Sequence, residues 1–326
     1  SLVGSEMCIR DSMNGVQITG LANLAGGTMR GVQLAGISNI SGDNTVGLSA
    51  AGLVNITGDK AQGVVISGLT SIGGDNNSGL MISGFMNVTG NMASGLHFSG
   101  IANITGQSFG GLMASGLLNV VGEHMNGLQI AGIANITASK LNGVQVALCN
   151  YATKARGLQI GLVNYYKEDM KGFQLGLVNA NPDTKVQMMV YGGNATPANI
   201  GVRFKNQLFY TILGLGSMYQ GLNDKFSASA SYRAGLSFPL YKGLSISGDL
   251  GYQHIEAFDN KDEVIPKRLY ALQARANLEY QFTKTFGIFA TGGYGVTRFY
   301  NKSSNYDKGA IIAVSYTHLT LPTKRI

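Results

Sequence analysis

A glycine recurs every 16 residues from Gly15 to Gly143, and this period constrains the fold more than any other feature of the 326-residue chain. A second glycine column, from Gly20 to Gly132, keeps the same phase. So does an asparagine column from Asn23 to Asn135, which is broken once, by Ser71. A fixed period of this kind is typical of stacked repeat proteins, in which each unit packs against its neighbours. The chain is therefore predicted to contain a solenoid.

One repeat runs from Gly127 to Asn142 and reads GLQIAGIANITASKLN. Counted from Gly127 as position 1, apolar residues fall at positions 2, 4, 7 and 10. Positions 2 and 4 alternate as in a strand, but the parity changes at position 7, directly after the glycine at position 6. A corner or a bulge at that glycine resolves the conflict, because glycine tolerates the required backbone angles. Each unit is predicted to be one coil: short strand, glycine corner, second short strand and turn.

The interior of the stack is expected to combine an apolar core with a polar ladder. We expect the apolar residues at positions 2, 4, 7 and 10 to form the core that stacked coils share. Coils in a β-stack lie about 4.8 Å apart, so each asparagine amide can bond to the asparagine above and below it. Such a ladder satisfies polar groups that are otherwise costly to bury.

The last repeats are shorter and carry a recognisable motif. They contain GLQIGLVN at residues 157–164 and GFQLGLVN at residues 172–179, and the spacing of the first glycine falls to 14 and 15 residues. These units resemble a leptospiral-type family of bacterial surface repeats, and the resemblance covers about residues 14–180. It implies a cell-surface or envelope setting and no defined activity.

The two ends of the chain lie outside the pattern. Residues 1–12 (SLVGSEMCIRDS) lack the repeat, and residues 315–326 (SYTHLTLPTKRI) interrupt the last expected strand. Both look like sequencing-adapter read-through, and we exclude them as artefactual tails. Under this interpretation the natural N-terminus, with any signal peptide, is missing.

A change of composition divides the remaining chain. Residues 13–142 contain three Lys or Arg, four Asp or Glu and no tyrosine, whereas all 15 tyrosines lie at or beyond Tyr151. We therefore predict a β-solenoid domain at 13–185 and a second domain at 186–314. The net charge of +7 is spread over the second part without a basic cluster, which argues against nucleic-acid binding. Outside the first tail, Cys149 is the sole cysteine, so no internal disulfide is expected.

The second part shows a long period-2 alternation, for example over residues 226–238, 244–252 and 270–282. One face is apolar with aromatic residues near the strand ends, and the other is polar and charged. This pattern is typical of an outer-membrane β-barrel, with lipid outside and a polar interior. The alternative is a soluble antiparallel sandwich with one wet face. The segment is similar to small OmpA- or OmpX-type barrels, and we predict an antiparallel eight-stranded β-barrel with strands near 186–193, 198–205, 207–219, 225–239, 243–255, 268–282, 285–299 and 309–316.

Connections between these strands alternate in length, as expected when short turns lie on one side of a membrane and long loops on the other. The short ones lie at 205–206, 240–242 and 283–284, and the longer ones at 194–197, 220–224, 256–267 and 300–308. An eight-stranded barrel is just wide enough for side chains to fill. We expect Arg233, Asp249, Arg275 and Glu279 to point inward and pair there, which predicts a plugged barrel.

No residue is predicted to be catalytic, to bind a cofactor or to ligate a metal. Asp43, Asp59 and Asp75 share one repeat position and form either a cation ladder or a row of solvated turn residues. The row continues as Asn, Gln and Glu, which favours solvated turns. His97, His124 and His254 fall in unrelated positions and are interpreted as isolated surface histidines.

The chain is therefore predicted to be all-β and a non-enzymatic envelope protein. Its barrel would anchor it in the outer-membrane lipid, and its repeats, at the cell surface or in the periplasm, would serve display, adhesion or contact with envelope or host-surface macromolecules. One alternative is a porin-like channel whose repeats are themselves barrel strands. A second is a carbohydrate-active β-helix enzyme, which is the least favoured because residues 13–142 carry only seven charges.

Overall fold

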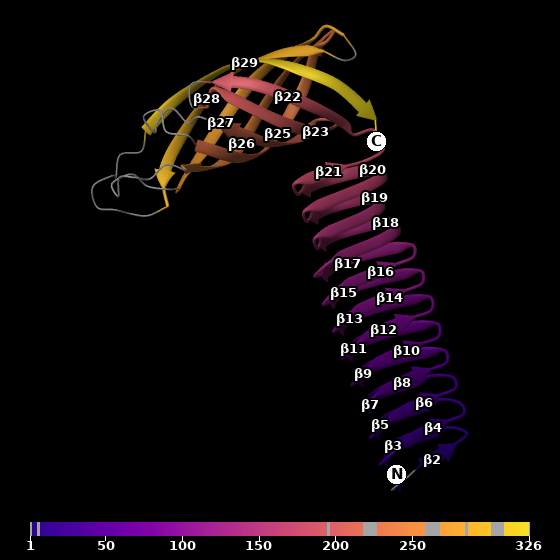
Figure 1. Ribbon diagram of the computed structural model, residues 1–326. Helices are drawn as coiled ribbons and strands as arrows, with labels where there is room; N and C mark the ends of the chain where they lie inside the picture. Colours follow the sequence, from indigo (N-terminus) through magenta and orange to yellow (C-terminus); the bar gives the residue numbers. More distant parts are fainter. Residues whose placement is uncertain are drawn as a thin grey trace. The chain divides into compact units, whose positions relative to one another are not determined.

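The computed structural model describes residues 2–4, 7–193, 196–217, 227–257, 268–283, 286–300 and 310–325. These residues form an all-β protein of two compact units, Ser1–Gly176 and Leu177–Ile326 (Figure 1). No helix among the described residues is both long and apolar enough to cross a bilayer. The two units are described in turn.

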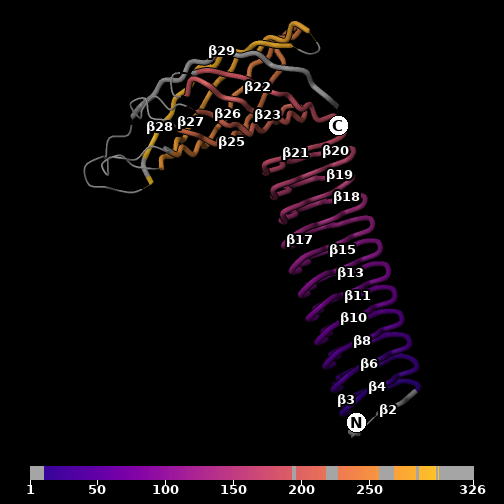
Figure 2. Tube along the Cα trace, viewed as in Figure 1, coloured from indigo at the N-terminus to yellow at the C-terminus, as the bar shows by residue number. Residues whose placement is uncertain are grey.

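The first unit is a parallel β-solenoid of flat coils, each with one long and one short strand (Figure 2). The long strands are β3 (Met13–Thr19), β5 (Met29–Ala35), β7 (Thr45–Ala51), β9 (Lys60–Ser67), β11 (Asn76–Ser83), β13 (Met92–Ser99), β15 (Ser108–Ser115) and β17 (His124–Ala131). The short strands are β4 (Ala22–Ala25), β6 (Ser38–Ser41), β8 (Val54–Thr57), β10 (Thr70–Gly73), β12 (Met86–Thr89), β14 (Ala102–Thr105) and β16 (Leu118–Val121). In the last coils the short strand and the following long strand join into one continuous strand. These strands are β18 (Ala134–Val146), β19 (Cys149–Ile160) and β20 (Val163–Leu175).

Each coil pairs in parallel with the next, so that residue i lies beside residue i+16. Gly79 pairs with Gly95, and Asn87 pairs with Asn103. The predicted corner at position 6 is confirmed, because every long strand ends at position 5 and the next short strand begins at position 8. The parallel register also excludes the alternative in which the repeats are strands of an antiparallel porin-like barrel.

Position 1 requires glycine for two reasons: its backbone conformation is unfavourable for other residues, and the preceding coil leaves no room for a side chain. In this column φ lies in the positive region, from +105° at Gly95 to +150° at Gly172. A Cβ built at Gly95 would lie 2.2 Å from the carbonyl oxygen of Gly79 in the preceding coil. Any side chain there would collide with backbone, which explains why the column continues without interruption.

The prediction that positions 2, 4, 7 and 10 form the core of the solenoid is wrong. Side chains at positions 3, 5, 9 and 11 are buried or half-buried inside the coil, whereas those at positions 2, 4, 7 and 10 face outward and are half-buried or exposed. The reason is parity within the short strand: neighbouring residues point to opposite faces, so an asparagine inside at position 9 places position 10 outside. From the sequence, the side chains of both position 9 and position 10 are predicted to lie inside the coil.

The asparagine ladder is confirmed, and it fills the coil together with other polar side chains. Asn103 Nδ2 donates to Asn119 Oδ1 at 2.9 Å and to the carbonyl of Ala114 at 2.8 Å. Where Ser71 interrupts the column, Asn55 Nδ2 donates instead to Ser67 Oγ at 2.7 Å. An apolar strip lies beside the ladder at position 15 and includes Met13, Met29, Phe109, Met125 and Leu141.

The segment assigned to an N-terminal tail adds strands to this stack. β1 (Leu2–Gly4) pairs in parallel with β3, and β2 (Met7–Arg10) pairs with β4. A β-ladder uses backbone N–H and C=O groups, so it does not depend on the repeat sequence. The origin of the tail stays a prediction.

The second unit begins at Leu177 with the short strand β21 (Val178–Ala180), and from β22 onward its strands form an antiparallel sheet. Its strands are β22 (Lys185–Gly193), β23 (Ala198–Asn206), β24 (Phe209–Ser217), β25 (Ser227–Tyr241), β26 (Leu244–Ala257), β27 (Arg268–Gln281) and β28 (Gly287–Phe299). The first seven predicted strands are confirmed within two residues at each boundary. β29 (Ala310–Arg325) pairs with both β28 and β22 and closes the sheet. It continues through residues 315–325, which the sequence had assigned to the second tail.

Tight turns join the strands at one end of this sheet. β23 and β24 are separated by Gln207 and Leu208, and β25 and β26 by Lys242 and Gly243. Gln207, Lys242 and Gly243 adopt positive φ, as such turns require. The predicted long connection at 220–224 lies outside the described residues, as do most of those at 256–267 and 300–308.

Candidate functional site

The outer wall of the closed sheet is apolar. Outward side chains alternate with inward ones along β26 and β27, and Leu250 near the middle of β26 is 72% exposed. Large apolar residues on this wall include Leu215, Leu236, Phe238, Ile246, Leu272, Leu278 and Ile288. An apolar patch of this extent is far larger than the surface of a soluble monomer normally shows.

Aromatic side chains mark both ends of the apolar wall. Tyr241, Tyr280, Phe282 and Phe286 are exposed near the tight-turn end. At the opposite end, Tyr270 stacks against Tyr252 with ring centroids 6.3 Å apart and lies 5.2 Å from the ring of Tyr300. From Tyr270 to Phe282, at about 3.3 Å per residue and a strand tilt of about 40°, the wall is roughly 30 Å tall. This height matches the hydrocarbon thickness of a bilayer.

Charged side chains fill the interior of the closed sheet. Arg275 Nε donates to Asp249 Oδ1 at 2.9 Å, and Arg233 Nη1 donates to the same oxygen at 3.2 Å. The other oxygen, Oδ2, accepts hydrogen bonds from Tyr210 Oη and Asn277 Nδ2, both at 2.9 Å. One buried carboxylate is thus held between two guanidinium groups and two neutral donors.

A second ion pair lies in the same interior. Arg203 donates through Nη1 and Nη2 to the two oxygens of Glu279, at 2.8 and 2.7 Å, in a bidentate arrangement. Arg203 Nε also donates to Gln187 Oε1 at 2.6 Å. The predicted inward pairing of Arg233, Asp249, Arg275 and Glu279 is confirmed, but sequence reasoning missed Arg203. The alternation along β23 could have predicted it, because Arg203 lies four residues after the buried Asn199 and therefore on the same face of the strand.

The solenoid also presents apolar side chains outward. In the coils that start at Gly15 through Gly143, positions 1–11 contain no Asp, Glu, Lys or Arg. The charged residues of the segment 13–142 lie at positions 13–16, on the edge opposite the glycine corner. In seven coils the corner exposes one large apolar residue: Leu21, Ile37, Leu53, Leu69, Phe85, Leu117 and Ile133.

The aspartate row behaves as a set of turn residues. The Asp75 carboxylate accepts hydrogen bonds from Asn76 Nδ2, at 2.9 Å, and from Asn91 in the next coil. Within the described ranges, no group of three or more His, Cys, Asp or Glu side chains converges on a common point that could hold a metal ion.

The prediction that all three histidines lie at the surface is wrong for His97. His124 is exposed and His254 is half-buried on the outer wall, but His97 is only 1% exposed. It occupies position 3, which points into the coil, and its ring meets Phe109 edge-on at 4.9 Å. Burial lowers the pKa of His97 from 6.5 to about 4, so the imidazole is neutral near pH 7.

Acid should weaken the solenoid through His97. The unfolded chain protonates this imidazole below pH 6.5, whereas the folded chain resists protonation until its pKa of about 4. Stability is therefore complete above pH 6.5 and falls by about 3 kcal/mol as the pH drops to 4. His97→Met is the matched variant, because Met81 and Met113 fill the same position in the adjacent coils. Urea unfolding at both pH values should show a smaller acid loss in the variant; equal losses would contradict this account.

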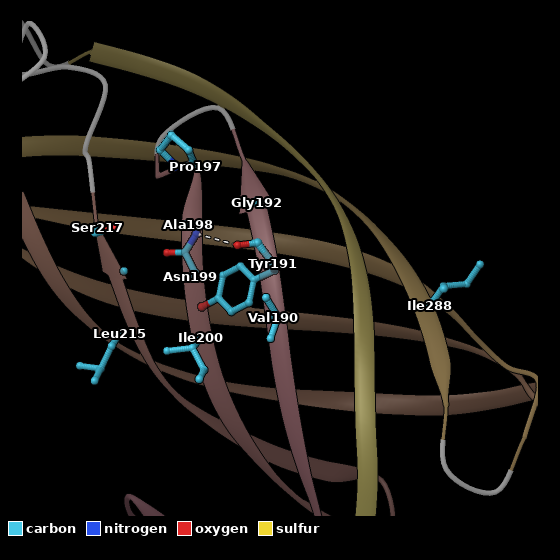
Figure 3. A pocket seen from close by; sticks show the side chains of 11 residues that line it. Val190, Tyr191, Gly192, Pro197, Ala198, Asn199, Ile200, Leu215, Ser217 and Ile288 are labelled. Atoms are coloured by element: carbon cyan, nitrogen blue, oxygen red, sulfur yellow. Dashed lines mark hydrogen bonds between the residues drawn. The ribbon is translucent and has the colours of Figure 1, made fainter.

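An apolar hollow of about 990 Å³ lies along β22, β23 and β24 of the closed sheet (Figure 3). Near it, Asn199 Nδ2 donates to the Tyr191 carbonyl at 3.2 Å. Its lining consists of Val190, Tyr191, Gly192, Pro197, Ala198, Asn199, Ile200, Leu215, Gly216, Ser217 and Ile288, without a charged group. Such a lining accommodates hydrocarbon better than a polar ligand.

The solved structures to which this chain is similar include two barrels. The N-terminal β-barrel domain of Pseudomonas aeruginosa OprF aligns at 17% identity and a TM-score of 0.31, over 42% of this chain and 96% of that domain. Neisserial surface protein A (NspA) aligns at 10% identity and a TM-score of 0.26, over 43% of this chain and 93% of that protein. These scores are too low to carry a functional assignment. No protein-family model and no curated protein matches the chain, so the resemblance to leptospiral-type surface repeats stays a prediction.

Proposed function

We propose that the chain is a non-enzymatic protein of the bacterial outer membrane, in which an eight-stranded barrel anchors a β-solenoid that serves display, adhesion or structural contact. One observation supports the anchor above all others. The closed sheet has an apolar outer wall with aromatic ends, and its interior holds Asp249 and Glu279 paired with arginines. This is the arrangement of a membrane barrel.

The same arrangement disfavours the soluble sandwich considered from the sequence. A soluble antiparallel sheet buries its apolar face and exposes its charges. Here Leu250 faces outward while Arg275 and Asp249 are buried. In water this inversion exposes a large apolar area, but in lipid it is favourable, and closure leaves no unpaired strand edge in the hydrocarbon.

The filled interior favours an anchor over a channel. Ion pairs and amides extend across the lumen, including Arg233 Nη2 donating to Gln273 Oε1 and Thr291 Oγ1 donating to Asn277 Oδ1 at 2.6 Å. Both buried carboxylates are engaged by arginines, as structural ion pairs are. The carbohydrate-active alternative needs clustered acids on one coil face, and the charges of the solenoid are instead confined to one edge of the coils.

Conductance of the reconstituted protein tests the anchor against the channel. The full chain is inserted into planar bilayers, with insertion checked in parallel by resistance of the barrel strands to added protease. We expect insertion without discrete conductance steps, because side chains fill an eight-stranded lumen. Steps of the size given by an open aqueous pore would contradict the proposal and support a channel.

A further inference from the structure

The charge distribution around each solenoid coil is strongly one-sided. Over nine coils the first eleven positions contain no formally charged residue, so the glycine corner, the short-strand face and the long strand from its position-1 glycine onward are free of Asp, Glu, Lys and Arg. Every charge of residues 13–142 falls near the other corner, at positions 13–16: Arg30, Asp43, Asp59, Lys60, Asp75, Glu123 and Lys140. The stack is therefore amphipathic across its width.

The apolar side chains cover three sides of the coil and not one. Leu96 and Ile130 are exposed on the long-strand face, Leu69 is exposed at the corner, and Ile72 is exposed on the short-strand face. A second copy of the chain would cover one flat face and leave the opposite face in water. A fluid hydrocarbon phase covers all three sides together.

The solenoid also meets the condition that lipid imposes on backbone structure. In hydrocarbon every N–H and C=O group needs a partner within the protein. The coil corners satisfy this through the stack, since Leu69 N donates to the Leu53 carbonyl and Phe85 N to the Leu69 carbonyl, at 2.9 and 2.8 Å. The asparagine side chains inside the coils bond to one another between neighbouring coils, as the Asn103 to Asn119 contact illustrates.

The width of the coil matches one leaflet of a bilayer. From the glycine corner at position 6 to the polar corner at position 12, six residues at about 3.3 Å each span roughly 20 Å. One leaflet with its headgroups is also about 20 Å thick. A coil inserted corner-first would therefore place its charged edge at the headgroup layer.

We propose that the solenoid inserts its charge-free side into a single leaflet of a lipid bilayer, with the column that contains Leu69 deepest and the row that contains Asp59 at the headgroups. The proposal rests on the chain being an outer-membrane protein, and it names lipid as the direct partner of the repeats. The repeated apolar surface would then be a membrane-contact surface.

Depth-dependent fluorescence quenching tests this proposal on the full chain. In a background with Cys8→Ala and Cys149→Ala, single cysteines replace Leu69, Asp59 or Leu250 and carry an environment-sensitive fluorophore. Each protein is reconstituted into phosphatidylcholine–phosphatidylglycerol vesicles with brominated acyl chains, and iodide is the aqueous quencher. Leu69 and Asp59 lie at opposite corners of the solenoid and form the matched pair, while Leu250 reports on the barrel.

We expect the bromolipid to quench the probes at residues 69 and 250, and iodide to quench the probe at residue 59. Bromolipid quenching of the probe at residue 250 but not of the probe at residue 69 would overturn the leaflet proposal and leave the barrel anchor standing. A probe at 69 shielded from both quenchers would overturn it in favour of a protein cover such as a second copy. Bromolipid quenching at residue 59 would refute the edge-in orientation. No bromolipid quenching at residue 250 would instead refute the barrel anchor itself.

Discussion

Replacing Asp249 with asparagine should destabilise the barrel by about 3–5 kcal/mol, because it removes the carboxylate that neutralises two buried guanidinium groups. Arg233 and Arg275 both donate to Asp249, and the structure also directs Tyr210 and Asn277 at it. Asparagine keeps the size of the side chain, so the effect measures charge and not packing. The readout is urea unfolding of the full chain in detergent micelles, followed by tyrosine fluorescence.

The control for this prediction is the exposed pair between Glu256 and Arg268. Their side chains lie 3.2 Å apart where β26 ends and β27 begins, beyond the aromatic end of the apolar wall, and solvent screens the charges there. Glu256→Gln should change the unfolding free energy by less than about 1 kcal/mol. A triple replacement of Arg233, Asp249 and Arg275 by apolar residues of similar volume should recover most of the loss. Equal effects of Asp249→Asn and Glu256→Gln would contradict the buried network.

Replacing Gly95 with valine should destabilise the solenoid by about 3 kcal/mol or more. Two causes act together at this position. Its φ of +105° is unfavourable for any L-residue with a side chain, and a Cβ would lie 2.2 Å from the Gly79 carbonyl oxygen. Relief requires the two coils to separate, which breaks the ladder between β11 and β13.

The control lies in the adjacent coil. Gly110 precedes the repeat glycine Gly111, and a Cβ built at Gly110 meets no atom within 4 Å. Gly110→Ala should therefore be close to neutral, whereas Gly95→Val should expose the stack to protease at low urea. The measurement is the urea dependence of limited proteolysis, read at the turns near Asp59 and Glu123. Equal resistance of the two variants would contradict the close stacking of the glycine columns.

The period of the sequence predicted the coils, but it did not predict which side chains face inward. Position 9 was correctly placed inside because asparagines at a 16-residue spacing can bond to one another. The prediction for position 10 was wrong because we expected apolar residues to be buried. Its neighbour, the asparagine at position 9, was already placed inside the coil. Successive side chains of a strand point to opposite faces, so positions 9 and 10 of the four-residue strand cannot both face inward. This rule could have been applied to the sequence alone.

The barrel was easier to predict because its charges and its apolar residues alternate over long strands. The inward set of Arg233, Asp249, Arg275 and Glu279 followed from that alternation. The choice of partners did not, because Arg203 and Glu279 are 76 residues apart and meet only across the closed interior. Such contacts depend on strand tilt and stagger, which the local pattern does not encode.

Fractionation of bacterial membranes tests the central claim most directly, namely that the closed sheet is embedded in the outer membrane. Cells express the gene with an intact export signal, and their membranes are separated on a sucrose gradient and washed with alkaline carbonate and then with urea. The account predicts that the chain stays in the outer-membrane fraction after both washes, since its apolar wall faces lipid. Release into the soluble fraction by either wash, with the protein still folded, would contradict it.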